Sequence, residues 1–295
     1  MIVQGLIVLA ASCCVTSSVK AQIADLNISP KRLVLDQTSR AGAVYVFNRG
    51  SRPATYAVSL DDKVMTPDGR IRSLEEAAGA AEGAATIARA RSARSMIVFT
   101  PHRVTLEGGS SQVVRLRVLR PLDLAAGEYR AHLTVRELPP ESAGLTADQA
   151  AANENGALSF QITTLLGVSI PVIVRQGPPD VRAGIEGVGY AIGAAPAGPA
   201  PGSPAKVARV TLQLLRQGQS SLFGDVEIRA MAGGKLGALV GLLRGVGVYT
   251  EIDRRTVEVA LTRIPAPGAR LAVVFRQEDA KPGEALATAY LTVPS

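Results

Sequence analysis

The chain has 295 residues, a net charge of +7 and 4% aromatic residues, with no tryptophan. Its length allows two ordinary domains, and their cores must be built from Val, Leu, Ile and Ala. The positive charge is dispersed as single arginines, such as Arg115 and Arg117 on the polar face of an alternating segment. A basic stripe interleaved with aromatic residues is missing, so the sequence does not favour nucleic-acid binding.

The first 21 residues are typical of a cleaved export signal. Residues 5–11 are apolar, and Val19-Lys20-Ala21 ends in the small-x-small pattern that a signal peptidase accepts. We therefore expect residues 1–21 to be a signal peptide, with a mature chain that starts at Gln22 and lies outside the cytoplasm. A lipid anchor at Cys13 is the alternative.

Cys13 and Cys14 are the only cysteines, and both lie in this segment. We therefore expect neither a disulfide framework nor a cysteine-ligated metal site in the mature chain. No later apolar run approaches the ~20 residues of a membrane span, so stable membrane insertion is not expected.

Short segments with period-two alternation follow one another through the first half of the chain, each bounded by turn residues. Residues 73–94 differ, because they are rich in Ala and Glu and predict either a short amphipathic helix or a mobile excursion. The first expected strand spans 23–35, as an edge strand that tolerates Pro30. The others are expected at 42–47, 55–60, 96–99, 104–106, 113–119 and 129–138.

The longest alternation lies at residues 158–175, which read LSFQITTLLGVSIPVIVR. Every second side chain from Leu158 to Val174 is apolar except Thr164, and Leu165 and Ile173 break the polar set between them. Alternation of this kind indicates a strand with one buried face. It lasts about twice the usual strand length. The segment is therefore either an ordinary core strand, as one strand or as two joined at Gly167, or a strand that offers its apolar row to another molecule.

Gly177-Pro178-Pro179 is the strongest domain boundary in the sequence. We expect an N-terminal domain at 22–177 and a C-terminal domain at 178–295. About seven short strands in the first domain are typical of an immunoglobulin-like β-sandwich. The fold class is therefore all-β, with two such sandwiches. In the second domain, strands are expected at 181–192, 206–215, 225–229, 236–243, 256–261, 270–275 and 286–293.

The residues that would indicate catalysis are sparse. The glycines between Gly184 and Gly193 lack the preceding strand and following helix of a dinucleotide site, so they are better explained as part of a twisted strand. His102 and His132 have no neighbouring acidic or serine motif, and a metal site at Asp61-Asp62 is unsupported. We expect neither an enzyme nor a cofactor.

Four groups of residues resemble the periplasmic chaperones of the chaperone–usher pathway, which escort pilus and fimbrial subunits. The similarity covers about residues 27–177. Residues 27–33 (NISPKRL) are similar to the family's first strand, and 99–115 to its "P…L-x-P-G-x-x-Q-x-x-R" strand pair. Residues 128–140, which run from EYR to RELPP, and 170–175 (IPVIVR) are similar to its last strands of the first domain.

The resemblance implies two sandwiches arranged as a boomerang, in a protein that lends a β-strand to a pilus subunit whose own sandwich lacks one. It also implies an outer-membrane usher as a second partner. The alternating side chains at 158–168 would fill the subunit's open groove. We call the expected subunit-binding side chains the donor row: Leu158, Phe160, Ile162, Leu166 and Val168.

The resemblance also assigns roles to charged residues. Arg32 matches the arginine that grips the subunit's C-terminal carboxylate. The family's partner lysine falls at Pro171 here, so Lys31 or a larger hydrophobic contribution would have to compensate. Glu128, Arg175 and a C-terminal acid, for which Asp279 is the candidate, match an ion network that fixes the interdomain angle; the alternative is a surface pair.

The competing hypothesis is an exported structural or adhesive protein made of two immunoglobulin-like domains. An adhesive sandwich has no need for an overlong alternating strand after a polar loop, and this feature favours the chaperone hypothesis.

Overall fold

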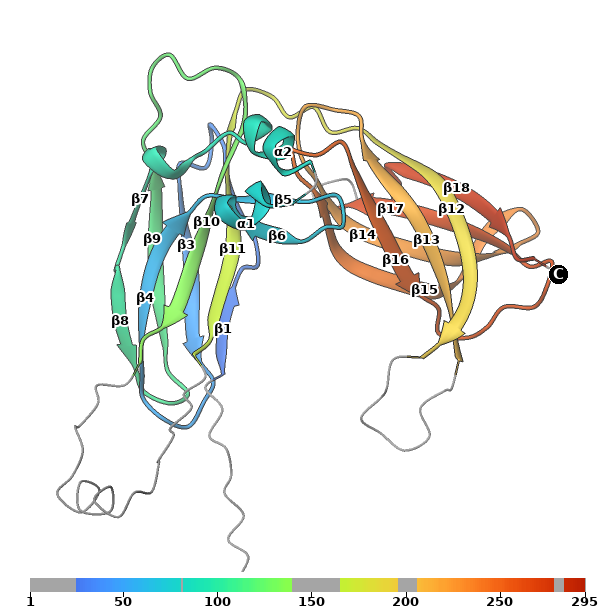
Figure 1. Ribbon diagram of the computed structural model, residues 1–295, viewed down its shortest axis with the longest axis horizontal. Coiled ribbons are helices and arrows are strands. Elements are labelled where there is room, and N and C mark those ends of the chain that lie inside the picture. Colours follow the sequence, from blue (N-terminus) through green and yellow to red (C-terminus); the bar gives the residue numbers. More distant parts are fainter. Residues whose placement is uncertain (1–24, 81, 140–164, 196–205, 279–283, 295) are drawn as a thin grey trace, which may run out of the picture.

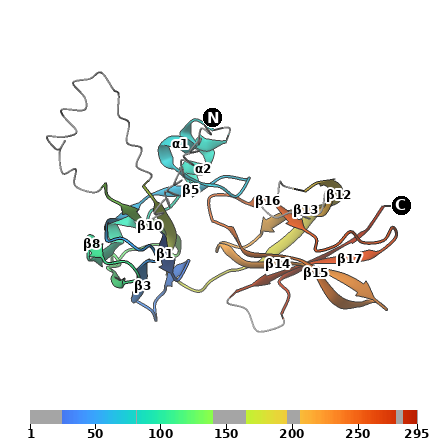
Figure 2. The ribbon, with the colours of Figure 1, turned by 90° about the horizontal axis from the view of Figure 1, so that it is seen from below.

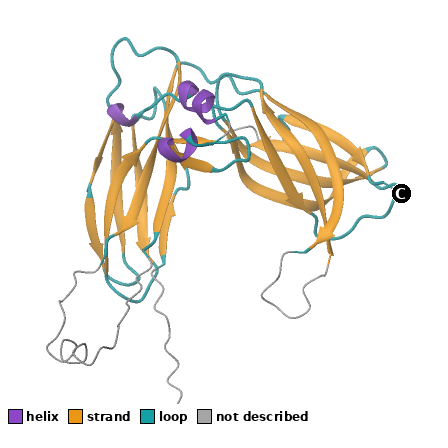
Figure 3. Cartoon of the chain, viewed as in Figure 1, coloured by secondary structure: helices purple, strands orange, loops and turns teal. Residues whose placement is uncertain are grey.

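The computed structural model describes residues 25–80, 82–139, 165–195, 206–278 and 284–294. Two β-sandwiches lie at an angle to each other and are joined by a short linker after residue 176 (Figure 1). Strands make up most of the molecule, and the helices gather near the junction of the two sandwiches and at one end of the first (Figure 3). The all-β fold with two sandwiches, predicted from the alternation, is confirmed.

The N-terminal sandwich is built from two sheets. All neighbouring strands are antiparallel except β2 and β11, which run parallel. The first sheet has the order β1 (Leu26–Ser29), β3 (Ala41–Asn48), β9 (Ser111–Val118) and β7 (Ile97–Thr100). The second has the order β2 (Leu33–Leu35), β11 (Gly167–Gln176), β10 (Gly127–Glu137), β4 (Ala54–Asp61) and β8 (Arg103–Leu106).

The prediction of one edge strand across residues 23–35 is wrong. The segment forms two strands in different sheets, β1 against β3 and β2 against β11. Pro30, Lys31 and Arg32 separate them, and Pro30 has no N–H to donate to a continuous ladder. The change of sheet leaves part of the β11 edge uncovered.

The core of this sandwich consists of aliphatic side chains from the alternate positions of both sheets. Ile28, Val44, Val114 and Leu133 are fully buried, and Tyr56 is the largest buried side chain among them. Burial of one such aliphatic side chain contributes about 1.5–3 kcal/mol.

The C-terminal sandwich has its own core around Phe275 and Leu212. The glycine-rich stretch lies in β12 (Ala183–Ala194), where the register against β13 (Lys206–Arg216) shifts between Glu186 and Gly189, and Gly187 has a φ of 58°. It is a bulged strand. One sheet has the order β12 (Ala183–Ala194), β13 (Lys206–Arg216) and β16 (Arg254–Ala260); the other has the order β15 (Lys235–Val248), β14 (Leu222–Ala232), β17 (Arg270–Gln277) and β18 (Ala287–Thr292).

Residues 62–93 form an excursion between β4 and β7, which we call the strap; the structure describes all of it except residue 81. It contains a hairpin of β5 (Lys63–Met65) and β6 (Ile71–Ser73), followed by α1 (Leu74–Ala78) and α2 (Gly83–Arg89). Ser73 caps α1, because it accepts from the Glu76 N–H while the Glu76 carboxylate accepts from the Ser73 N–H. Of the two sequence alternatives for 73–94, helix is correct, as two short helices that precede a 3-10 turn at Arg94–Met96.

Among the described residues, no helix is long and apolar enough to cross a lipid bilayer.

Candidate functional site

The β11 strand has one partly open edge. Its whole length pairs with β10, from Gly167 opposite Arg136 to Gln176 opposite Gly127. On its other side, β2 covers only Val172–Val174. Within the described part of the chain, no strand pairs with residues 167–171 on that side. An uncovered stretch of strand offers unpaired backbone groups to a strand from another molecule.

The apolar row of β11 becomes less buried along this open stretch. Val172 and Val174 are fully buried in the N-terminal core, and Ile170 is 2% exposed. Val168 is half-buried against the same core, and Leu166, just before the strand, is also half-buried. The apolar side chains of β11 are therefore progressively less buried in the protein's own core from Val172 toward residue 165.

Only two members of the donor row lie in the described residues. The structure places Leu166 and Val168 at the uncovered end of β11, whereas Leu158, Phe160 and Ile162 lie outside the described residues. The sequence predicts a strand from 158; the described strand begins at Gly167. Ile173, which breaks the alternation, faces the C-terminal sandwich and belongs to its core cluster.

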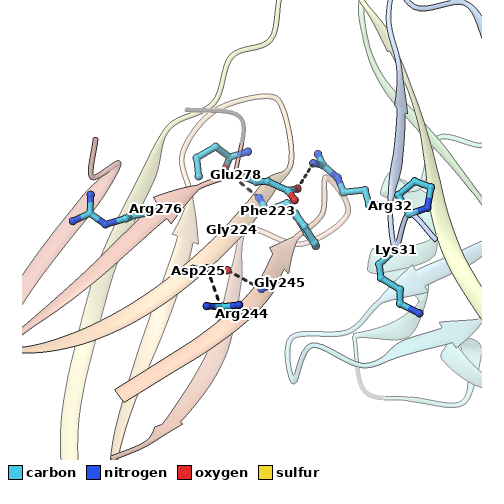
Figure 4. A pocket seen from close by; sticks show the side chains of 11 residues that line it. Lys31, Arg32, Phe223, Gly224, Asp225, Arg244, Gly245, Arg276 and Glu278 are labelled. Carbon is cyan, nitrogen blue, oxygen red and sulfur yellow. Dashed lines mark hydrogen bonds and ion pairs between the residues drawn. The ribbon is translucent and has the colours of Figure 1, made fainter. Parts of the chain in front are cut away.

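Arg32 lies in a cleft of about 580 Å³ between the two sandwiches. Its guanidinium reaches the C-terminal domain, where Nη1 lies 3.7 Å from Oε2 of Glu278 and Cζ lies 4.8 Å from the centre of the Phe223 ring (Figure 4). The Arg32 side chain is only 5% exposed, while that of Glu278 is 59% exposed. Arg244, Arg276 and Asp225 also line the cleft; Arg244 lies 3.9 Å from the Asp225 carboxylate and Arg276 lies 3.3 Å from that of Glu227.

Lys31 also lines this cleft but extends away from Glu278 (Figure 4). Its ammonium donates to the Asn27 side-chain oxygen, and the residue is exposed. Pro171, where the resemblance leads us to expect a lysine, lies opposite His132 in the β10–β11 ladder. Lys31 therefore lies on the same side of the cleft as Arg32, where a second cation for a carboxylate would be needed.

Glu128 and Arg175 are paired directly across β10 and β11, and Arg175 Nε donates to Glu128 Oε2 at 3.1 Å. The two side chains are 2% and 11% exposed, so this is not a surface pair. The Ser221 N–H of the C-terminal domain donates to the same oxygen at 3.3 Å. Asp279 lies outside the described residues.

The sequence does not predict the buried ion pair of Arg130 and Glu251, which joins the two domains. Arg130 Nη1 donates to Glu251 Oε2 at 3.0 Å, Nη2 bonds Glu251 Oε1, and both side chains are almost fully buried. The Arg130 guanidinium also stacks on the Tyr249 ring at 4.0 Å. The only signal in the sequence is that Glu128 and Arg130 occupy alternate positions of one long strand, and such a pattern equally indicates a strand face exposed to solvent.

His132 lies next on the same face of β10 and is 1% exposed. Burial, together with the positive charges of Arg130 and Lys63, lowers its pKa from 6.5 to about 2. Neither ring nitrogen has a hydrogen-bond partner among the described residues. His132 therefore remains neutral in the folded protein at physiological pH.

Groups of three or more His, Cys, Asp or Glu side chains that could hold a metal ion do not occur in the described part of the chain. Asp61 accepts from the Ser59 hydroxyl, and Asp62 accepts from the Ser92 hydroxyl at 2.7 Å. The two carboxylates thus contact different serines.

No protein-family model and no curated protein matches this sequence. Solved structures with a similar chain course include fimbrial chaperones. The CupB2 chaperone of Pseudomonas aeruginosa is 12% identical with a TM-score of 0.40, over 90% of this chain and 100% of that one. The YadV chaperone is 11% identical with a TM-score of 0.41, over 91% and 100% of the two chains.

The SafB chaperone of Salmonella enterica, solved in complex with the SafA pilin, is 10% identical with a TM-score of 0.41, over 92% of this chain and 97% of that one. At this level of similarity, the function has to be argued from the residues themselves.

Proposed function

We propose that this protein is an exported, non-enzymatic chaperone that binds pilus or fimbrial subunits by lending them a β-strand and delivers them to an outer-membrane usher. A subunit that lacks its last strand has an open hydrophobic groove, and it aggregates unless a strand fills that groove. The chaperone would supply this strand from residues 158–171, in the periplasm.

The observation that carries the proposal is the uncovered edge of β11 at Gly167–Pro171. At this edge the backbone can pair with a subunit strand, while the alternating side chains enter the subunit's groove. Burial of four or five aliphatic side chains, at ~1.5–3 kcal/mol each, is sufficient for a stable complex.

The cleft supports the same proposal. Arg32 directly precedes β2, which pairs with β11, and it lies in a cleft whose lining has four cationic and two acidic side chains: Lys31, Arg32, Arg244, Arg276, Asp225 and Glu278. An arginine binds a carboxylate through charge-assisted hydrogen bonds, so Arg32 would hold the subunit's C-terminal carboxylate. Glu278 pairs with Arg32 and would have to yield to an incoming carboxylate.

Co-expression tests the proposal. The protein is produced with the small secreted β-subunits encoded beside its gene, and periplasmic extracts are purified through a tag on the protein. We expect an equimolar complex with at least one subunit, and loss of that subunit to aggregation when the protein is omitted. Subunits that remain soluble without the protein and never co-purify with it would favour the structural or adhesive alternative.

A further inference from the structure

The strap belongs to neither sheet of the N-terminal sandwich, because its strands β5 and β6 form a separate two-stranded sheet. Within the described residues, the N-terminal core contains no side chain from 63–91. The strap is closed at its base, because the Ser92 hydroxyl donates to the Asp62 carboxylate at 2.7 Å. Figures 1 and 2 both place its helices at the junction of the two sandwiches.

The hairpin of the strap packs on the C-terminal sandwich. Met65 is 3% exposed and belongs to the C-terminal core cluster, although it is more than 110 residues away from that domain's first strand. Its backbone N–H donates to Glu251 Oε1 at 2.6 Å. In the turn that follows, the Pro67 carbonyl accepts from the Thr256 N–H at 3.1 Å.

The same turn admits the side chain of a C-terminal residue. Gly69 has a φ of 81°, and a Cβ added there would lie 2.1 Å from Nε of Arg255. Only glycine meets both demands, since it tolerates the left-handed conformation and leaves room for the guanidinium.

The helical part makes a further interdomain contact. Arg89, at the end of α2, donates two hydrogen bonds to the Asp253 carboxylate, at 2.8 and 2.6 Å. Arg216 of the C-terminal domain donates to the same carboxylate at 2.9 Å. The bonds from Arg89, together with both positive charges, hold the pKa of Asp253 below its ordinary value.

We propose that the strap is an interdomain brace: it fixes the angle between the two sandwiches and thereby holds the cleft around Arg32 at a set position relative to the open edge of β11. Two domains joined by a short linker and a polar interface are expected to move relative to each other unless an additional contact restrains them. The first half of this proposal is independent of the proposed function, and the second half rests on it.

The decisive variant replaces residues 64–90 by a four-residue Gly-Ser linker. The bond between Asp62 and Ser92 brings the two ends of the strap together, so a short linker can close the gap. The pairs Arg130–Glu251 and Arg175–Glu128 lie outside the replaced segment and are retained.

Variation in the angle between the sandwiches is measured as the width of the distance distribution between two spin labels. One label is attached at Gln112→Cys in the first domain and the other at Thr288→Cys in the second. Both positions are exposed. Cys13 and Cys14 are the only native cysteines, and both lie in the expected signal peptide, so the two introduced thiols of the mature chain are labelled specifically. Circular dichroism and thermal unfolding verify that each variant is folded.

We expect one narrow distribution for the full chain and at least a doubling of its width without the strap. A milder double variant, Met65→Ala with Arg89→Ala, should broaden it as well. The matched control, Arg70→Ala with Glu75→Ala, alters two exposed positions within the strap and should leave the distribution unchanged. An unchanged distribution in the folded strapless variant overturns the brace.

Subunit capture separates this proposal from the proposed function. If the full chain captures a subunit, the strapless variant should capture at least tenfold less. Undiminished capture by a strapless variant with a broadened distribution overturns the second half of the proposal. If the full chain captures none, the proposed function fails, while the distance distributions still decide whether the strap is a brace.

Discussion

Arg130 and Glu251 form a buried ion pair that joins the two sandwiches, although 121 residues separate them in the sequence. Arg130 lies in β10, the middle strand of the five-stranded sheet of the N-terminal sandwich, and Glu251 lies in the turn between β15 and β16. Their side chains are 6% and 2% exposed, and the Arg130 guanidinium also donates to the Lys63 carbonyl at 3.0 Å. Removal of either charge would leave the other buried without its partner.

We therefore expect Glu251→Ala to lower the free energy of unfolding by about 3–5 kcal/mol, because loss of one member of a buried pair leaves an uncompensated charge. Glu258→Ala is the matched control, since this glutamate is 60% exposed in its contact with Arg209. The control should change stability by no more than about 1 kcal/mol. Urea denaturation of both variants measures the difference, and equal effects would contradict the structural role assigned to Glu251.

The pKa of His132 predicts a pH dependence of stability. The folded-state pKa of about 2 lies below the unfolded value of 6.5, so only the unfolded chain binds a proton between these values. The stability that the neutral His132 imidazole contributes is therefore fully present above pH 6.5, and it is lost as the pH falls from 6.5 toward 2. Protonation of His132 in the unfolded chain should lower the free energy of unfolding by about 2 kcal/mol between pH 7 and pH 5.

Urea denaturation at pH 7 and pH 5 tests this dependence. His132→Gln should reduce the loss of stability between the two pH values by most of this amount. The control is His102→Gln, because His102 is exposed. It should behave as the wild type does. If the wild type and His132→Gln lose the same free energy between pH 7 and pH 5, the neutral buried imidazole is not the cause.

The pairing of Arg32 with Glu278 predicts that two substitutions act in opposite directions. Arg32→Ala should lower subunit capture, whereas Glu278→Gln should raise it a few-fold, because it removes a carboxylate that competes with the subunit's own. Since Glu278 is 59% exposed, the gain corresponds to no more than about 1 kcal/mol.

The fraction of co-expressed subunit that co-purifies gives the readout for this pair of variants. Glu284→Gln, an exposed charge change elsewhere in the C-terminal domain, serves as the control. Capture that is insensitive to both Arg32→Ala and Glu278→Gln would remove Arg32 from the binding site.

The strand pattern was largely readable from the sequence, because alternation directly reports which face of a strand is buried. The expected strands at 42–47 and 55–60 correspond to β3 and β4, and those at 206–215 and 270–275 to β13 and β17. The change of sheet between β1 and β2 was not readable, since alternation identifies a buried face but not the sheet to which it belongs.

The interdomain contacts were the least predictable part of the site. Met65 and Ile173 are ordinary apolar residues in the sequence, and their partners come from the second sandwich, whose first strand begins at Ala183. Arg130 and Glu128 occupy the alternate positions that a solvated strand face would also fill. Only the resemblance to a known family pointed to Glu128 and Arg175, and no feature of the sequence pointed to Glu251.

The central claim is that alternate side chains of residues 158–168 enter the open groove of a subunit. Its most direct test compares Asp substitutions at two successive donor-row positions, Phe160 and Ile162, with Asp substitutions at the intervening positions, Gln161 and Thr163. The measurement is the amount of subunit that co-purifies per folded molecule of the protein. We predict at least a tenfold loss for Phe160→Asp and Ile162→Asp, and near wild-type capture for Gln161→Asp and Thr163→Asp; equal capture by all four variants would contradict the claim.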